Sequence, residues 1–194
     1  STIYTGGFDQ DVQSVFLEGN GAVIDLQEDM ITIDGAGKKL DLYKCVFINT
    51  IMDSSLFISY KNGASGKIIN NTLFGLNNSS KNWYAISFVE CTSDSIIIQN
   101  NIFSNFYAPI YYYTIDTVPL LHLNYTSNNL IHNCDKTYLA QGPWAGPPSQ
   151  FTPFPGDGEI FDDPLFKSSS LLDFSLSTNS PCIDNGKNIG YSFN

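Results

Sequence analysis

Aromatic side chains are the residues of this chain best suited to contact a ligand. The 194 residues include 14 Phe, 11 Tyr and two Trp, and Tyr111, Tyr112 and Tyr113 are consecutive. Neighbouring side chains of a strand point to opposite faces, so Tyr111 and Tyr113 share one face and Tyr112 takes the other. Exposed rings pack on the apolar faces of sugars, while nearby amides and hydroxyls bond the sugar hydroxyls. The pattern predicts a carbohydrate-binding surface made from Tyr111, Tyr113, Trp144, Tyr107, Trp83, Tyr112, Phe151 and Phe154.

Three of these aromatic residues lie in a segment of unusual composition. Residues 139–158 contain five Pro and several Gly, which exclude a helix and a central strand. An inserted loop of this length is uncommon in a compact domain and is often functional. Two interpretations stay open for Trp144, Phe151 and Phe154: they bind a ligand, or they pack down on the end or flank of the fold.

No catalytic set can be assigned from the sequence. His122 and His132 stand outside any recognisable catalytic motif, and no two carboxylates can be paired across a sugar as inverting hydrolysis requires. Four carboxylates fall within seven residues and could supply oxygen ligands to Ca²⁺, although their spacing does not match an EF-hand loop. They are Asp157, Glu159, Asp162 and Asp163. We therefore expect no metal or other cofactor, and binding is favoured over catalysis.

The composition excludes several classes of partner. The formal net charge is −10, and all nine basic residues are Lys. Nucleic acid and anionic membranes are bound by basic patches, which this chain lacks the charge to build. A polyanionic substrate such as polygalacturonate is disfavoured for the same reason. No run of about 18 apolar residues could insert into a membrane, so a neutral polysaccharide fits the composition best.

Short apolar segments recur along the chain at nearly constant spacing. Ile31, Ile58 and Ile86 are 27 and 28 residues apart, and a second set with spacings of 27, 29 and 28 is Val46, Leu73, Ile102 and Leu130. Gly-, Asn- and Ser-rich corners separate the segments. A period of this size is typical of a repeat fold in which each turn of chain buries its apolar face on the next.

Asparagine pairs follow the repeated segments. Stacked parallel strands place like residues about 4.8 Å apart, so Ile69 and Ile98 are predicted to form a core column. Asn tolerates the left-handed conformation of a tight corner, and its amide can bond both the turn backbone and the next Asn. We therefore interpret these residues as structural ladders, with the predicted columns Asn71/Asn100/Asn128 and Asn101/Asn129.

The repeats resemble a known superfamily. The sequences Asn70-Asn71-Thr72-Leu73-Phe74 and Asn100-Asn101-Ile102-Phe103 are similar to those of right-handed parallel β-helix proteins, which include pectate lyases and many microbial surface proteins. Residues 162–166, 173–176 and 180–186 resemble the closing segment of many extracellular β-helices. The resemblance implies an all-β, right-handed parallel β-helix in which residues 160–194 close the last turn through Phe166, Phe174, Leu176 and Ile183. This architecture hosts lyases, hydrolases, adhesins and stalks, so it implies less about activity.

In its aromatic content and its lack of a catalytic set, the chain also resembles the tapirins, non-catalytic cellulose adhesins of plant-biomass bacteria. This resemblance implies a monomeric, secreted or cell-surface domain that binds a plant polysaccharide, with cellulose as the leading expectation. Two alternatives remain. One is a polysaccharide lyase or glycoside hydrolase of the β-helix superfamily, and the other is a passive surface or phage-tail stalk.

The length and the cysteines limit the organisation of the chain. We expect a single domain over residues 1–194, and the start at Ser1 suggests a fragment of a longer secreted protein. Cys45, Cys91, Cys134 and Cys182 show no metal-ligand spacing. Four buried thiols are expected, and disulfides, such as one between Cys134 and Cys182, are the alternative.

Overall fold

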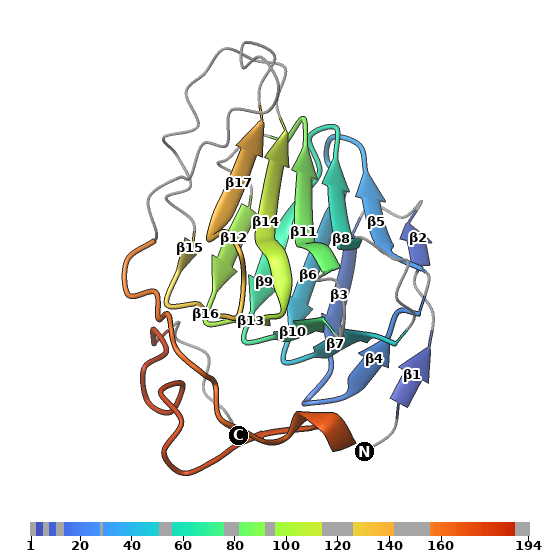
Figure 1. Cartoon of the computed structure of the whole chain (residues 1–194). Helices are drawn as coiled ribbons and strands as arrows, with labels where there is room; N and C mark the ends of the chain where they lie inside the picture. Colours follow the sequence, from blue (N-terminus) through green and yellow to red (C-terminus); the bar gives the residue numbers. More distant parts are fainter. Residues whose placement is uncertain are drawn as a thin grey trace.

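The chain is an all-β parallel β-helix built from three parallel sheets (Figure 1). The computed structural model describes residues 3–5, 8–10, 14–27, 29–50, 56–75, 82–91, 96–113, 126–141 and 156–188. Sheet A contains β1 (Ile3–Thr5), β4 (Val23–Asp25), β7 (Val46–Asn49), β10 (Thr72–Gly75), β13 (Ile102–Ser104) and β16 (Leu130–His132). Sheet B contains β2 (Phe8–Gln10), β5 (Ile31–Asp34), β8 (Leu56–Lys61), β11 (Asn82–Val89), β14 (Phe106–Tyr113) and β17 (Tyr138–Gln141). Sheet C contains β3 (Ser14–Glu18), β6 (Lys39–Tyr43), β9 (Ser65–Ile69), β12 (Ile96–Gln99) and β15 (Thr126–Ser127).

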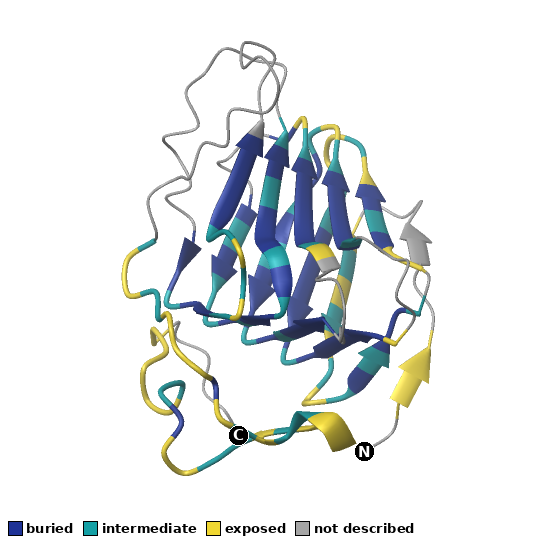
Figure 2. Ribbon diagram, viewed as in Figure 1, coloured by how far each residue is buried: buried dark blue, intermediate teal, exposed yellow. Residues whose placement is uncertain are grey.

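The core is a set of stacked columns enclosed by the three sheets (Figure 2). Ile31 lies opposite Ile58, and Ile58 lies opposite Ile86, so the predicted column is confirmed. Ile110 extends it by one more strand, and all four side chains are fully buried. Burying one such side chain contributes roughly 1.5–3 kcal/mol, which makes the columns the main source of stability.

The second predicted column is wrong by one residue. Thr72, not Leu73, lies opposite Ile102 and Val46. Leu73 instead lies opposite Phe47 and Phe103 and is fully buried. In the same way, Ile98 pairs with Ile68 rather than with Ile69. The prediction aligned aliphatic residues with one another and so misplaced the register. In the structure the alignment of these strands is set by the asparagine pairs that precede them.

A corner between sheets C and A sets this register. The first corner position is left-handed at five successive levels, at Lys44, Asn70, Asn100, Asn128 and Gly158, with φ values of 52, 58, 58, 54 and 73°. The next position forms a buried ladder, in which the backbone N–H of Asn71 donates to Asn101 Oδ1 at 2.9 Å and that of Asn101 donates to Asn129 Oδ1 at 3.0 Å. Asn71 therefore belongs with Asn101 and Asn129, as the backbone pairing also requires, and not with Asn100 and Asn128 as predicted.

The C-terminal segment departs from the predicted closing role. Residues 156–160 add a partial turn, with Asp157 bridging to Ser127 and Ile160 to Leu130. The chain then forms the antiparallel hairpin β18 (Phe166–Ser168), 3-10 helix η2 (Ser169–Leu171) and β19 (Asp173–Leu176), which runs beneath sheet A (Figure 1).

The hairpin covers the flank of the β-helix rather than its end. Phe166 and Phe174 pack edge-on against Phe74 of sheet A, with ring centroids 6.0 and 5.1 Å from it. Leu172 joins them over the outward-facing Val23, Val46, Ile48 and Phe74. Ile183 is 40% exposed and does not seal the last turn. The outer face of sheet A is apolar, and this face is what the hairpin buries.

Strand β17 and the four cysteines bear on two further predictions. Residues 139–141 belong to β17, so the predicted loop at 139–158 begins later than expected, and residues 142–155 lie outside the described residues. All four cysteines are free thiols, two of them buried and two half-buried. Cys45 stands at the start of the asparagine ladder, where its backbone N–H donates to Asn71 Oδ1 at 3.0 Å.

Candidate functional site

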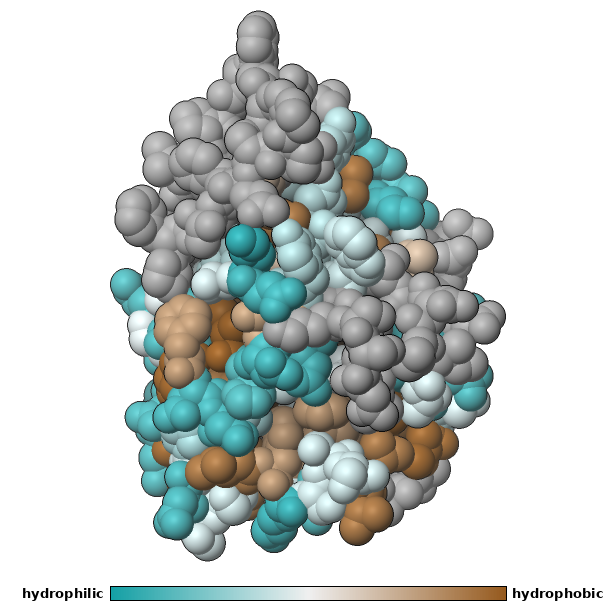
Figure 3. All heavy atoms as spheres, viewed as in Figure 1, coloured by the Kyte–Doolittle hydropathy of each residue, from teal (hydrophilic) through white to brown (hydrophobic). Residues whose placement is uncertain are grey.

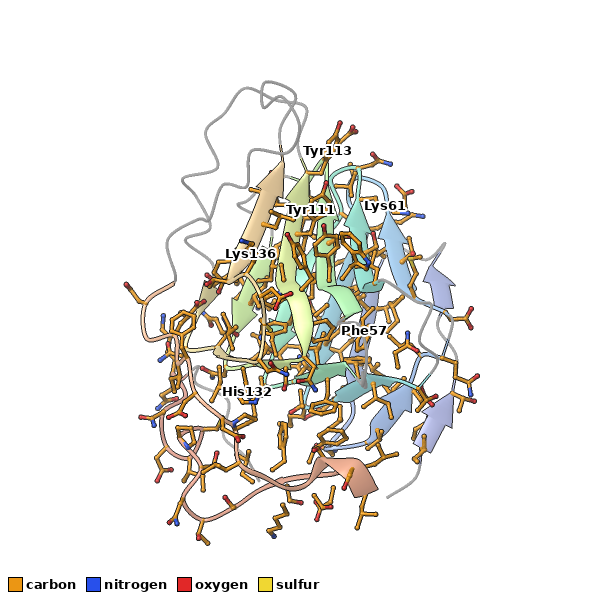
Figure 4. All side chains as sticks on the ribbon, viewed as in Figure 1. Phe57, Lys61, Tyr111, Tyr113, His132 and Lys136 are labelled. Atoms are coloured by element: carbon orange, nitrogen blue, oxygen red, sulfur yellow. The ribbon has the colours of Figure 1, made fainter. Side chains whose placement is uncertain are left out.

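The outer face of sheet B carries the predicted tyrosines. β11 and β14 are eight residues long and pair in parallel, with Ser87 opposite Tyr111 and Val89 opposite Tyr113. Ile110 and Tyr112 are buried, whereas Tyr111 and Tyr113 are half-buried. Figure 4 shows Tyr111 and Tyr113 on the face of this sheet that is turned towards the viewer. The alternation of the strand therefore places both rings on the outside, as predicted.

Four rings from these two strands form an aromatic cluster, which we define as Trp83, Tyr84, Tyr107 and Tyr111. Tyr84 and Tyr111 are stacked, with centroids 4.6 Å apart and an interplanar angle of 16°. Trp83 lies 5.6 Å from Tyr107 at 50° and 6.1 Å from Tyr84 at 66°. Trp83 is 55% exposed. The stacked pair therefore supports an exposed indole at the edge of the cluster.

Tyr84 was not among the predicted site residues. If side chains alternated strictly along this strand, Tyr84 would point into the core as Ile86 does. In the structure Ala85 and Ile86 are both fully buried, so the alternation slips by one residue and Tyr84 lies outside. Pro109 stands one position after Ala108, the partner of Tyr84 on β14. Proline within a strand marks a bulge or an edge because it lacks the N–H. That residue is the sequence signal that could have revealed the slip.

Burial raises the pKa of the Tyr84 phenol, and the neighbouring phenols of Tyr111 and Tyr107 raise it further. Burial likewise raises the pKa of Tyr111, with a second contribution from Tyr113. Both groups therefore keep their protons well above neutral pH. A neutral phenol can donate and accept hydrogen bonds, which suits uncharged hydroxyl groups of a ligand.

Two lysines border the cluster in an otherwise acidic chain. Figure 4 shows Lys136 and Lys61 on either side of Tyr111. The backbone N–H of Lys136 donates to the carbonyl of Tyr107 at 2.8 Å, and Lys61 pairs with Val89 across β8 and β11. Hydrophilic and hydrophobic side chains are interspersed on this face (Figure 3). The described part of this face therefore mixes polar and apolar side chains.

One predicted ligand-binding residue does not belong to the exposed surface. Tyr112 is only 9% exposed, and its hydroxyl donates to the carbonyl of Cys91 at 2.5 Å. It is therefore a core residue and cannot contribute to an exposed surface. Trp144, Phe151 and Phe154 lie outside the described residues. The structure thus brings together Trp83, Tyr107 and Tyr111, with Tyr113 next to them on β14.

The predicted calcium candidates do not converge. The structure describes all four candidate carboxylates. In the part of the chain that it describes, no group of three His, Cys, Asp or Glu side chains is suited to hold a metal. Asp162 and Asp163 accept backbone N–H bonds at 2.8 Å from Asp163 and Leu165. Their carboxylates therefore shape a turn.

Glu159 has a separate role in the fold. Its carboxylate accepts hydrogen bonds from the Tyr138 hydroxyl and, at 3.4 Å, from Asn129 Nδ2. It therefore continues the asparagine ladder into the partial turn. Burial is the main cause of a raised pKa for this carboxyl group.

Comparison with family models, with curated proteins and with solved structures found no significant match for this chain. No helix in the described segments is long and apolar enough to cross a membrane. The aromatic cluster and the sheet that carries it are therefore the features of the described structure that bear on function.

Proposed function

We propose that this chain is a non-catalytic polysaccharide-binding domain of the adhesin type, and that its aromatic cluster binds cellulose or a related neutral polysaccharide. The observation that carries the proposal is the exposed Trp83, held by Tyr84 and Tyr107 on the outer face of sheet B. An indole on a surface offers a flat apolar face to the C–H groups of a sugar ring.

The geometry assigns different roles to the rings. Tyr84 and Tyr111 cover each other's faces at 4.6 Å, so they act mainly as a support. Trp83 and Tyr107 are tilted by 50° to one another and leave the indole accessible. The supporting strands are paired on both sides, so little conformational entropy is lost when a ligand binds.

A neutral ligand agrees with the charges of the chain. The net charge of −10 repels polyanions, and burial raises the pKa of Tyr84 and of Tyr111 further above neutral pH, so these two phenols are uncharged there. Neutral phenols and two flanking lysines can donate hydrogen bonds to hydroxyl groups. We place such a domain outside the cell or on its surface, where plant polysaccharides are found, and expect it to act as a monomer without a cofactor.

Adsorption to microcrystalline and amorphous cellulose tests the proposal. Trp83→Ala should weaken adsorption roughly five-fold or more, since a ring that stacks on a ligand contributes about 1–3 kcal/mol by analogy with stacked bases. The melting temperature should change little because Trp83 is mostly exposed. Phe16→Ala is the matched control, since Phe16 is 65% exposed on sheet C and its loss should leave adsorption unchanged.

Equal effects of the two substitutions, or a wild-type protein that ignores cellulose, would contradict the proposal. Assays for cleavage of pectin, alginate, xylan and cellulose separate it from the enzyme alternative, because release of reducing ends requires a catalytic site. A trimer in sedimentation experiments that binds none of these polysaccharides would support the stalk alternative.

A further inference from the structure

Tyr84 of β11 and Tyr111 of β14 hold two phenol rings face to face on the outer surface of sheet B. Their centroids are 4.6 Å apart, and their planes are 16° from parallel. Nearly parallel rings touch at a plane separation of about 3.5 Å, so this centroid distance corresponds to a sideways offset of roughly 3 Å. The edge of each ring therefore lies over the other ring, and carbon atoms of the two phenols are in van der Waals contact.

The sheet keeps the two rings within reach of each other. β11 also pairs with β8, and β14 also pairs with β17, so neither strand is at an edge of the sheet. The backbone pairs Tyr84–Ala108 and Ser87–Tyr111 fix the register of the two strands. The side chains can turn about their own bonds, but the backbones that carry them cannot separate without breaking the sheet. The contact between the phenols is thus built into the fold.

No other pair of tyrosines has this geometry in the part of the chain that the structure describes. Tyr84 also approaches Tyr107, but those centroids are 6.4 Å apart and the planes are inclined by 67°. An edge-on arrangement of this kind brings fewer carbon atoms together than a stack does. Tyr84 and Tyr111 are half-buried, so a small reagent in the solvent can still reach them. The stacked pair therefore combines close contact with access.

Stacked phenols have a chemistry that other stacked rings lack. Removal of one electron and the O–H proton from a tyrosine leaves a radical that is shared with the two ring carbons ortho to the oxygen. Two such radicals that meet join through these carbons. A fold that already holds the two rings in contact replaces a rare encounter in solution by a step within one molecule. Tyr84 and Tyr111 are placed for this coupling.

We propose that Tyr84 and Tyr111 are a modification site, at which a haem peroxidase-type oxidant acting with hydrogen peroxide forms a dityrosine bond between β11 and β14. Each phenol gives up one electron and its O–H proton, and a carbon–carbon bond forms between the two ortho positions. The ring protons at these positions then move to the phenol oxygens, which restores both aromatic rings. Hydrogen peroxide takes up the two electrons and two protons and is reduced to two molecules of water.

The bond would give the β-helix a covalent link between successive turns. All four cysteines are free thiols, so no disulfide provides such a link. A bond between Tyr84 and Tyr111 closes one full turn of chain and restricts the unfolded state, as a disulfide does. It leaves the indole of Trp83 in place. The modification therefore stabilises the fold and does not depend on whether the aromatic cluster binds a polysaccharide.

Oxidation of the dilute protein with hydrogen peroxide and a small haem peptide tests the proposal. We expect dityrosine fluorescence in the monomer fraction, a monomer mass lower by two hydrogen atoms, and a cross-linked peptide that joins Tyr84 to Tyr111 in tandem mass spectrometry. Tyr84→Phe and Tyr111→Phe keep the ring and remove the phenol oxygen. Each should lower the dityrosine signal of the monomer by about ten-fold or more, since the remaining tyrosine has no partner in contact.

Two controls separate the stack from chance encounters. Tyr107→Phe removes a phenol of the same cluster that is not stacked on Tyr84 and should leave the yield unchanged. Wild-type protein that is oxidised in concentrated urea should lose the product that joins Tyr84 to Tyr111, because only the fold holds these rings together. The oxidised wild type should also melt several degrees higher than Tyr84→Phe treated in the same way.

The proposal is overturned if the oxidised monomer contains no dityrosine, or if its cross-linked peptides join other tyrosines. It is equally overturned if the unfolded chain gives the same product in the same yield, since the stack would then have no part in the reaction. Dityrosine that occurs only in covalent dimers would assign the reaction to exposed tyrosines of two molecules. Equal melting temperatures for the oxidised wild type and the oxidised Tyr84→Phe protein would rule out the stabilising link.

Discussion

Tyr84 and Tyr111 stack across two neighbouring strands with ring centroids 4.6 Å apart and planes only 16° from parallel. The two residues lie on β11 and β14, but they are not direct partners, because Tyr84 pairs with Ala108 and Tyr111 with Ser87. Their stacking results from the slip in alternation around Ala85. This relationship gives the outer face of sheet B an aromatic support that a regular strand pair would lack.

The stack predicts a measurable coupling between the two tyrosines. Tyr84→Ala and Tyr111→Ala should show an interaction energy of about 0.5–1.5 kcal/mol in a double-mutant cycle. The free energies of unfolding can be obtained from urea denaturation. Tyr84→Ala combined with Phe16→Ala is the control pair, and its effects should add because Phe16 lies on sheet C. Additive effects for both pairs would show that the stack contributes nothing to stability.

The asparagine ladder predicts a large cost for one buried substitution. Asn101→Leu leaves the backbone N–H of Asn71 and the carbonyl of Ile68 without their partners. The free energy of unfolding should fall by about 2–5 kcal/mol, since each buried unpaired group costs about 1–3 kcal/mol. Asn133→Gly, at an exposed position, should change it by less than about 0.5 kcal/mol. A loss below about 1 kcal/mol for Asn101→Leu would mean that the ladder does not stabilise the corner.

Glu159 predicts a pH dependence of stability. Burial raises its pKa above the ordinary value of 4.5, so the folded protein holds this proton more tightly than the unfolded chain. The contribution of this carboxyl group to the stability of the fold is therefore greatest below about pH 4.5. It is lost as the pH rises through the pKa of the folded state. Glu159→Gln removes the titration, so its melting temperature should decline less between pH 4 and pH 8. Parallel profiles for the two proteins would contradict a raised pKa.

The hairpin predicts how the protein responds to loss of its C-terminal segment. Phe174→Ala removes the edge-on contacts with Phe74 and Phe166 and should lower the free energy of unfolding by about 1–3 kcal/mol. Leu171→Ala is the control, because Leu171 is 80% exposed. Deletion of residues 161–194 should expose the outer face of sheet A and cause aggregation in light scattering. A truncated protein that stays monomeric and melts cooperatively would show that the hairpin is dispensable.

The sequence predicted the class of fold because stacking repeats one physical environment at each level. Ile31, Ile58 and Ile86 share one core column, so their spacing alone identified the period. The register at Thr72 and Leu73 was harder, since both residues fit a strand and only the ladder decides which one faces the core. The place of the hairpin could not be predicted, because its apolar residues match either the end or the flank of the β-helix.

The candidate site was predicted only in part for a similar reason. Alternation along β14 correctly separated Tyr111 and Tyr113 from the buried Tyr112. The same rule fails on β11, where the neighbouring residues Ala85 and Ile86 both belong to the core and Tyr84 is moved to the outer face.

The corner geometry makes each level of the molecule a module that can be copied. Every ladder asparagine accepts an N–H from the level before it and donates to the one after, as Asn101 does between Asn71 and Asn129. A duplicate of residues 72–101 placed after Asn101 would begin and end on the same corner, lengthening the molecule by about 4.8 Å. It would also carry a second copy of Trp83 and Tyr84, so the aromatic face would become longer as the β-helix becomes longer. The length of this fold would thus set the number of aromatic clusters that the outer face of sheet B carries.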